Sequence, residues 1–582
     1  MTTTRSGFTK LAAVCIAILL GAVVWELGWP LTRAEHEWSR LIAAVATLGH
    51  LTGILGSYFR KEINRPSLRL LIFQIISCLM IFLLIAREQQ EAGYMRFTEL
   101  SRLVITAGLI AIPTLMSLTR IFEWLVGKQK KGRPLMAPAM QFVASLGVVI
   151  LAGTGLLLLP NSTYPGITLS FTDALFTSTS AVCVTGLNAV DFAHTFTPLG
   201  EMFTLALIQI GGFGIMTFAY FVAMVAGQGF SLRDRVLLTD RLDEDNLGAV
   251  VSFITTIVVS TLFIELCGAV LLYFSWEGKD INLMGEPLWW HSLFHSVSAF
   301  CNAGFSTFPM NLMEPGIRLC YSGQAVIMAL IVCGGLGFGI YKEINSRLAN
   351  RFFSKHRRLH MQWTPYFKLV MISTGILLAG GALAIFAVSS PHAAEPLGEH
   401  LWICLFDSVT ARTAGFNISD YGRYLPAASL IMCGLMMVGG SPGGTAGGMR
   451  TTTCAIAGAE ILRILRGRDH VEFFRRRIDQ RTVARCVITV VVSCAWIGCF
   501  TVLICALEPS MSSLDIFFEN CSAFATVGVS RGITPDLSGP SKYLLIVNML
   551  AGRVGLFAFL IALAGTPTPR HYRYPSVKIP LT

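Results

Sequence analysis

Long apolar runs, separated by short polar or basic segments, follow one another along nearly the whole chain. A helix needs about 20 mostly apolar residues to cross a bilayer, and twelve runs come close to this length. Four come first, at 9–29, 41–58, 68–86 and 100–119. Four pairs follow, at 137–159 with 199–226, 249–275 with 322–342, 366–389 with 425–462, and 486–507 with 540–564. The pattern predicts an all-α membrane protein.

A short amphiphilic segment, followed by a stretch that ends in a single glycine, lies between the two runs of each pair. The stretches are SAVCVTG at 180–186, SAFCNAG at 298–304, TARTAG at 410–415 and SAFATVG at 522–528. Consecutive end glycines are 118, 111 and 113 residues apart. This spacing predicts one unit used four times: a spanning helix, a half-span helix with a loop, and a second spanning helix.

Composition agrees with a membrane protein and excludes several other classes. Hydrophobic residues make up 53% of the chain and charged residues only 14%, whereas a soluble domain has roughly 25% charged residues. The 15 cysteines form no CxxC pair and no cluster with histidine at zinc spacing, so we interpret nearly all of them as buried small hydrophobes. The sequence shows no nucleophile, base and orienting group of an enzyme and no GxGxxG nucleotide site.

The distribution of positive charge predicts the orientation of the chain. The net charge of +11 could indicate nucleic acid, but in a membrane protein the position of the charges decides their meaning. If the chain starts in the cytoplasm, 31 of its 45 lysines and arginines fall in inner segments and 11, Arg412 among them, in outer segments. Both termini are therefore expected in the cytoplasm, and all four glycine-ended stretches enter from the outer side.

Four re-entrant loops predict a path for an ion. Irregular backbone is tolerated at membrane depth only where protein buries it or water lines it, so the loops are expected to meet at one axis. Glycine lets peptide carbonyls turn toward that axis, and a ring of carbonyls can replace the hydration shell of a large monovalent cation. As half-span helices, the segments 173–179, 293–297, 401–409 and 515–521 would aim their partly negative carboxyl ends at the same centre.

These loops define the predicted domains and the candidate ion-binding residues. The domains are an N-terminal four-helix membrane segment at 1–130, pore repeats at 135–228, 248–345, 365–466 and 484–566, and a cytoplasmic tail at 567–582. The candidate filter residues are Cys183, Val184, Thr185, Gly186, Cys301, Asn302, Ala303, Gly304, Arg412, Thr413, Ala414, Gly415, Ala525, Thr526, Val527 and Gly528.

The third repeat also carries a glycine-rich run, MVGGSPGGTAGGM at 437–449. Glycine costs a helix about 1 kcal/mol and proline about 3, so we expect an unwound segment that lines or blocks the path. A P-loop would need a Gly-Lys-Ser/Thr ending, which is missing. Arg553 in the last apolar run should pair with buried carbonyls, either as a barrier to cations or as a structural anchor. The candidate gate residues are Gly439, Gly440, Ser441, Gly443, Gly444, Thr445, Gly447, Gly448 and Arg553.

The four motifs, over about residues 135–565, resemble those of the TrkH and KtrB family of potassium-translocating subunits. The resemblance implies a four-glycine potassium filter, with Gly186 rather than a sodium-associated serine at the first position, and an intramembrane gating loop faced by Arg553. It also implies potassium as the transported ion with no organic cofactor, a bacterial inner membrane, and a homodimer on a cytosolic nucleotide-binding ring. The third stretch departs from the pattern, because Phe406 precedes Gly415 by nine residues whereas Phe294 precedes Gly304 by ten.

Several residues keep more than one interpretation. Transport coupled to sodium or protons would favour intramembrane carboxylates, for which Glu201 and Glu265 are the main candidates. His291 and His295 have metal-like spacing, but packing or hydrogen bonding is favoured. Asp191, Asp407 and Glu519 could attract cations at the mouth or bond backbone N–H groups. Close helix packing is the simplest interpretation of Gly211, Gly212, Gly334, Gly335 and Gly552.

Overall fold

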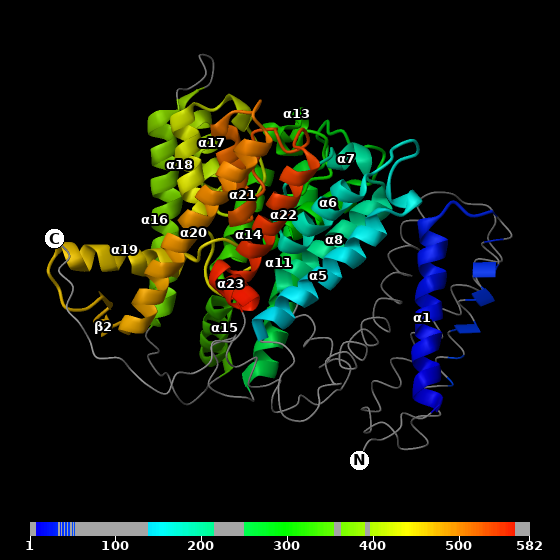
Figure 1. The fold of residues 1–582 in the computed structure, drawn as a ribbon, viewed down its shortest axis with the longest axis horizontal. Helices are drawn as coiled ribbons and strands as arrows, with labels where there is room; N and C mark the ends of the chain where they lie inside the picture. Colours follow the sequence, from blue (N-terminus) through cyan, green and yellow to red (C-terminus); the bar gives the residue numbers. More distant parts are fainter. Residues whose placement is uncertain are drawn as a thin grey trace.

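The computed structural model describes residues 7–32, 138–214, 249–353, 363–389 and 396–564, with single positions between 35 and 52. Within these residues the chain is a bundle of helices (Figure 1), which confirms the predicted all-α class. Helix α1 (Gly7–Gly28) matches the first predicted span. The predicted spans at 68–86 and 100–119, most of 41–58 and the tail at 567–582 lie outside the described residues.

The helices between 138 and 564 follow the same order four times. A long helix comes first in each unit: α5 (Pro138–Leu157), α11 (Ala249–Trp276), α16 (Pro365–Val388) and α20 (Gln480–Leu507). A shorter helix follows: α6 (Phe171–Cys183), α12 (Leu288–Cys301), α17 (Leu397–Thr410) and α21 (Ser513–Ala525). The units close with α8 (Pro198–Phe213), α14 (Tyr321–Leu336), α18 (Pro426–Met437) and α22 (Gly539–Val554). The exact domain bounds given above stay predictions.

Shorter elements connect these helices. At one end of the bundle, here called the inner end after the orientation expected from the charges, α15 (Phe338–Phe353), α19 (Thr451–Leu465) and α23 (Leu556–Ala564) continue the last three units. Strand β1 (Glu472–Phe473) pairs antiparallel with β2 (Arg476–Arg477). The remaining pieces are single turns: η1 (Pro160–Ser162), α7 (Phe192–Thr195), η2 (Asn311–Met313), α13 (Pro315–Arg318) and η3 (Tyr421–Arg423).

The closing helices are not the continuous spans that the apolar pattern predicts. Helices α14 and α15 meet at an angle of 93° around Gly337, whose φ is +90°. Gly555, with φ +89°, separates α22 from α23 in the same way. Positive φ is available to glycine without steric cost but ends an α-helix. The predicted spans at 322–342 and 540–564 are therefore broken at these two positions.

One hydrogen bond anchors each short helix to the long helix before it. In every unit, one side chain of the short helix donates to a backbone carbonyl of the preceding long helix. This side chain lies eight residues before the end glycine in the first, second and fourth units, and seven residues before it in the third. The bonds are Ser178 to Ile150 at 2.7 Å, Ser296 to Glu265 at 2.6 Å, Ser408 to Leu378 at 2.8 Å and Asn520 to Ile497 at 2.8 Å. The same contact therefore fixes the depth of the short helix in all four units.

Small residues bring the closing helices against the short ones, as the sequence predicts. A Cβ on Gly211, Gly334 or Gly552 would press into the backbone carbonyl of Val182, Phe300 or Phe524, respectively. Each of these carbonyls lies four residues before the end glycine of its unit. Close packing at Gly211, Gly334 and Gly552 is thus confirmed, and it places the inner part of each closing helix beside the end of a short helix.

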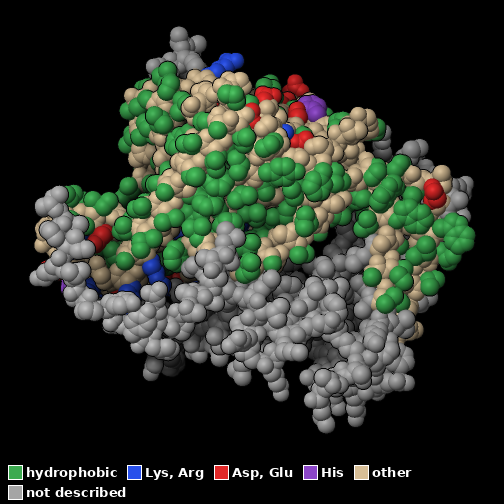
Figure 2. Space-filling view, viewed as in Figure 1, with side chains coloured by type: hydrophobic (Ala, Val, Ile, Leu, Met, Phe, Trp, Pro, Cys, Tyr) green, Lys and Arg blue, Asp and Glu red, His purple; other side chains and the backbone are tan. Residues whose placement is uncertain are grey.

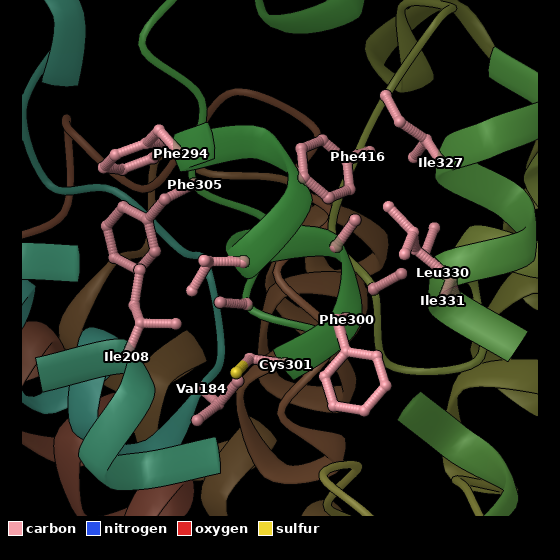
Figure 3. Close-up of a cluster of buried hydrophobic side chains, with 14 of the residues drawn as sticks. Val184, Ile208, Phe294, Phe300, Cys301, Phe305, Ile327, Leu330, Ile331 and Phe416 are labelled. Carbon is pink, nitrogen blue, oxygen red and sulfur yellow. The ribbon is translucent and has the colours of Figure 1, made fainter. Parts of the chain in front are cut away.

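Apolar side chains fill the centre of the bundle and also cover its side. In the core, Val184 and Cys301 lie close together at one end of α12, while Phe294 and Phe305 lie on one side of the middle of this helix and Phe416 lies on the other (Figure 3). On the outside, Figure 2 shows hydrophobic side chains across the face of the bundle, with charged side chains gathered near its ends. Within the part of the chain that the structure describes, three helices, α11, α16 and α20, are long and apolar enough to cross a membrane singly. This surface suits a lipid environment.

Candidate functional site

The four end glycines form a closed ring. If each glycine carried a Cβ, that atom would meet a backbone carbonyl of the neighbouring loop. Gly186 would meet the carbonyl just before Gly304, Gly304 the one before Gly415, Gly415 the one before Gly528, and Gly528 the one before Gly186. At Gly304 this carbonyl, Ala414 O, would lie 2.8 Å away, and at Gly415 the carbonyl of Val527 would lie 2.7 Å away. Segments more than 100 residues apart in the chain therefore meet at one axis.

The loop backbone repeats from unit to unit. The end glycines have φ values of +92°, +70°, +81° and +93° in chain order. Two residues earlier, Val184, Asn302, Thr413 and Thr526 have φ values of +57°, +61°, +70° and +52°. Positive φ is uncommon for residues other than glycine and costs of order 1–3 kcal/mol. Its recurrence at one position in all four loops shows that the surrounding contacts impose it.

A hydroxyl at the base of each loop holds this backbone. In the first and fourth units, Ser180 and Ser522 accept hydrogen bonds from the N–H groups of Gly186 at 3.0 Å and Gly528 at 3.1 Å. In the second and third units, Ser298 and Thr410 donate to the carbonyls that follow the glycine, Phe305 O at 2.8 Å and Phe416 O at 2.6 Å. The loops are thus fixed by two kinds of bond, each used twice.

The ring opens on one side into a vestibule of about 380 Å³. Gly186, Gly415 and Gly528 form its floor, and Asp191 and Asp420 lie among its walls. Asp191 has a half-exposed side chain and accepts from the backbone N–H of His194, which is one of the two roles considered for it. Two carboxylates at the rim of a vestibule favour cations over anions there.

Two other acidic residues near the loops are buried and hydrogen-bonded. Asp407 accepts from the hydroxyls of Tyr421, at 2.9 Å, and Tyr424. Glu519 accepts from the backbone N–H of Arg531 at 3.0 Å and from Thr534 Oγ1 at 3.0 Å. Asp407 thus holds the segment around Tyr421 and Tyr424 against α17. Glu519 holds the segment from Arg531 to Thr534 against α21.

The glycine-rich segment is unwound between α18 and α19, as predicted. Its ends lie side by side, because Val438 pairs with Met449 in a parallel bridge and Gly439 N donates to Met449 O at 2.8 Å. Thr451 N donates to Gly440 O at 3.0 Å, at the start of α19. Residues 438–450 therefore form a closed loop, here called the gating loop after the role expected of it from the sequence.

The gating loop lies against the inner ends of the short helices. Thr445 Oγ1 donates to Phe300 O of α12 at 3.2 Å. A Cβ on Gly447 would run into the hydroxyl of Thr526, and one on Gly448 would lie 3.1 Å from Ala525 Cα, at the end of α21. The loop thus sits directly beneath the glycine ring, on the side opposite the vestibule.

The break between α14 and α15 supports the gating loop from its flank. Phe338 N donates to Gly443 O at 3.0 Å, and Ser441 N donates to Gly335 O at 2.9 Å. The hydroxyl of Tyr366 on α16 donates to Pro442 O at 3.0 Å. Because the turn at Gly337 frees the backbone groups that these bonds use, the broken helix and the loop satisfy each other.

Three arginines touch the gating loop. The guanidinium of Arg553 donates to Thr445 O of the loop and to Gly211 O of α8. Arg450 donates to Ala446 O within the loop instead of reaching for the inner surface. Arg412, counted above with the outer cations, is 7% exposed and reaches Gly439 O at 3.4 Å, so its assignment to an outer segment is wrong.

The histidines and the two membrane carboxylates have structural partners. His295 bonds His291 O at 2.8 Å and Ser306 Oγ at 2.8 Å, and His291 Nδ1 lies 2.5 Å from Thr307 Oγ1. Among the described residues no group of three metal-ligating side chains occurs. Glu201 accepts from Trp290 Nε1 at 2.6 Å, and Glu265 accepts from Gln209 Nε2 at 3.1 Å.

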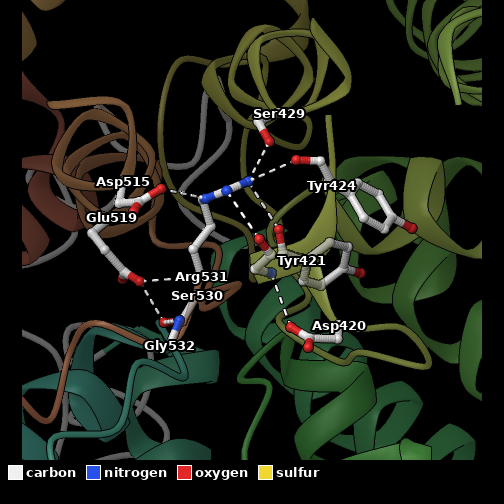
Figure 4. Close-up of polar contacts among 10 residues, drawn as sticks. Asp420, Tyr421, Tyr424, Ser429, Asp515, Glu519, Ser530, Arg531 and Gly532 are labelled. Carbon is white, nitrogen blue, oxygen red and sulfur yellow. Dashed lines mark hydrogen bonds and ion pairs between the residues drawn. The ribbon is translucent and has the colours of Figure 1, made fainter. Parts of the chain in front are cut away.

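Arg531, one of the 11 cations in the predicted outer segments, is a structural centre. Its guanidinium pairs with Asp515 at 2.6 Å and donates to Ser429 Oγ at 2.6 Å (Figure 4). It also donates to the carbonyls of Tyr421 at 2.9 Å and Gly422 at 3.1 Å. The arginine follows the fourth end glycine by three residues, so it ties the fourth loop to the outer part of the third unit.

The chain resembles known transport proteins over most of its length. The family model TrkH, described as "Cation transport protein", matches residues 105–574. Ktr system potassium uptake protein B of Bacillus subtilis is 34% identical over 446 residues, covering 74% of this chain and 94% of that protein. Potassium/sodium uptake protein NtpJ of Enterococcus hirae is 32% identical over 466 residues, covering 78% and 99%.

A solved structure shows the same fold. The potassium transporter TrkH from Vibrio parahaemolyticus aligns with a TM-score of 0.58 over 96% of this chain and 99% of that chain, at 16% sequence identity. The fold, the extent of the family match and the relatives above 30% identity agree. The chain belongs to the TrkH family of cation transport proteins.

Proposed function

We propose that this protein takes up potassium ions across the membrane through the ring of four glycine loops. The closed ring, with the same backbone in all four loops, is the observation that carries the proposal. It provides carbonyl groups from four directions at one axis, which is the arrangement that replaces the hydration shell of a large cation. The names of the relatives, potassium uptake protein B and potassium/sodium uptake protein, support potassium as the ion.

The proposed path has a mouth, a filter and a gate in series. Cations gather in the vestibule beside Asp191 and Asp420, and then pass the carbonyls of the loops that end at the four glycines. Beneath the ring, the gating loop and Arg553 stand in the way. A guanidinium at membrane depth repels a cation over a short distance because little water screens it. In this proposal, opening requires both to move aside.

Passive or gated flow fits the buried carboxylates better than obligatory coupling. Glu201 and Glu265 are each 3% exposed and accept from neutral partners, Trp290 and Gln209. Each of these bonds joins the first unit to the second, which is a structural task. We therefore propose that neither carboxylate carries a coupling ion.

We further propose that the chain works as a homodimer with a cytosolic nucleotide-binding ring. The relative from Bacillus subtilis is named as part of a Ktr system, which supports a partner protein. The excess of lysine and arginine in the predicted inner segments supports cytoplasmic termini on the side where such a ring would bind.

Growth of a potassium-uptake-deficient bacterium at low potassium tests the proposed function. The wild-type chain should restore growth, and Gly186→Ser should restore it less well and with a lower preference for potassium over sodium. A serine Cβ would press into Ala303 O at a position where φ is +92°, which distorts the carbonyl ring. Absence of rescue by the wild type would refute potassium uptake. An unchanged ion preference in Gly186→Ser would refute this filter.

Replacing Arg553 by alanine should raise potassium flux several-fold. The substitution removes a positive charge from the path and two hydrogen bonds that hold the gating loop and α8 together. Flux is measured in proteoliposomes at equal protein content. Arg463→Ala is the matched control, since Arg463 pairs with Glu460 on the inner side and touches neither the loop nor the ring. If Arg553→Ala folds well and shows wild-type flux, Arg553 is a structural anchor and not a barrier to cations.

A further inference from the structure

The third loop approaches the ring differently from the other three. Helices α6, α12 and α21 end three residues before their end glycines, whereas α17 ends at Thr410, five residues before Gly415. Three residues before the glycine, the other units have Cys183, Cys301 and Ala525, and the third has Arg412. A small side chain at the inner end of the loop is thus replaced by a long cationic one.

The guanidinium of Arg412 reaches both ends of the gating loop. Its Nη2 lies 3.4 Å from Gly439 O, where the chain leaves α18, and 3.3 Å from Thr451 Oγ1, where α19 begins. Thr451 Oγ1 also donates to Gly439 O at 2.9 Å. One side chain of the filter loop therefore completes a three-membered cluster that closes the neck of the gating loop.

This cluster depends on the loop because Arg412 has few other partners. The side chain is 7% exposed, and among the described residues it forms no ion pair with a carboxylate. A buried charge is tolerated only where polar groups surround it. If the gating loop moved, Arg412 would lose the carbonyl of Gly439 and the hydroxyl of Thr451 together. The position of the loop and the position of the third filter segment are thus energetically linked.

A small cavity beside the guanidinium completes the environment. It measures about 10 Å³ and is lined by Thr374, Gly335, Gly440 and Arg412, among others. The Nε of Arg412 and the hydroxyl of Thr374 have no hydrogen-bond partner among the described residues. A space of this size holds about one water molecule. The cavity borders Gly440, so the same loop movement would open or close it.

We infer that Arg412 is a positioning residue that couples the third filter loop to the gating loop, so that the state of the gate changes the geometry of the filter. The inference rests on the proposed function. Arg553 differs, because it contacts the middle of the gating loop and α8 but no residue of the third filter loop. Arg412 provides a second contact with the gating loop, and this contact connects the loop to the third filter loop.

Thr451→Val tests the coupling from the gate side, outside the filter. Valine keeps the shape of threonine but removes the hydroxyl that joins Arg412 to Gly439. Potassium flux and the potassium-to-sodium permeability ratio are measured in the same proteoliposomes for wild type, Thr451→Val, Arg412→Met and the double variant. Each single variant should raise flux and lower the ratio by about fivefold or more, within the usual range of coupling between sites. The double variant should show no further change, because both substitutions break one link.

Two controls keep the outcomes distinct. Arg463→Ala, which removes a cation that contacts neither the gating loop nor Arg412, should leave flux and the permeability ratio unchanged, and Arg412→Lys, which keeps the charge, should restore part of the ratio lost in Arg412→Met. An unchanged ratio in Thr451→Val, or additive changes in the double variant, would overturn the coupling while leaving potassium uptake intact. A wild-type protein without potassium flux would instead overturn the proposed function and this inference with it. If Arg412→Met does not fold, the ratio measured for Thr451→Val decides alone.

Discussion

Gly415→Ala is expected to reduce potassium uptake by about 100-fold, the effect of roughly 3 kcal/mol of strain at the ring. Alanine would have to adopt a φ of +81°, and its Cβ would lie 2.7 Å from Val527 O, 2.9 Å from Gly304 Cα and 3.3 Å from Gly528 Cα. These atoms belong to the second and fourth units, and both units would have to move away from the third to relieve the contacts, so one methyl group disturbs most of the ring. Initial uptake rates at equal membrane abundance measure the effect.

Gly434→Ala is the matched control for this substitution. Gly434 belongs to α18 in the same unit, and a Cβ there would meet nothing within 4 Å. Because alanine favours a helix by about 1 kcal/mol over glycine, this variant should keep wild-type uptake. If Gly415→Ala transported as well as Gly434→Ala, the four glycines would not form the narrow part of the ion path.

The sequence predicts the ring because its signal is local and repeated. Each loop lies within a few residues of its glycine, and the unit recurs at nearly constant spacing. The unwound gating loop could be predicted for a similar reason, since several glycines and Pro442 fall in one apolar run. In both cases a short stretch of chain determines its own conformation.

The helix breaks at Gly337 and Gly555 carry no such signal. Gly375, Gly380 and Gly434 also stand inside apolar runs, yet each stays within a regular helix. What ends α14 at Gly337 is the gating loop, whose carbonyls and N–H groups bond the freed backbone from another part of the chain. A partner that lies about 100 residues away cannot be found from the local pattern.

Arg412 shows the same limit for charged residues. Counting lysines and arginines by segment places it with the outer loops, because the positive-inside rule treats a cation as part of its connecting segment. The structure points its side chain inward to Gly439 and Thr451. The shorter approach from Phe406 to Gly415 is the sequence feature that accompanies this difference, and the third unit alone combines it with a gating loop.

Arg531→Ala is expected to lower the stability of the folded protein by about 3 kcal/mol, the usual cost of removing one partner from a largely buried ion pair. The side chain is only 10% exposed, and its loss leaves Asp515 unpaired at the start of α21. It also leaves the carbonyls of Tyr421 and Gly422 and the hydroxyl of Ser429 without their donor. The fourth loop would then lose these hydrogen bonds to the third unit.

Thermal unfolding of the detergent-solubilised protein measures this effect, with Arg423→Ala as the control. Arg423 lies on the same outer side and pairs with Asp420 at 3.2 Å, but its side chain is 81% exposed. Exposed pairs contribute about 0–1 kcal/mol, so its removal should leave the melting temperature almost unchanged. Equal melting temperatures for the two variants would show that the loops hold their ring without Arg531. A drop confined to Arg531→Ala would instead show that the contacts of Arg531 between the third and fourth units stabilise the fold.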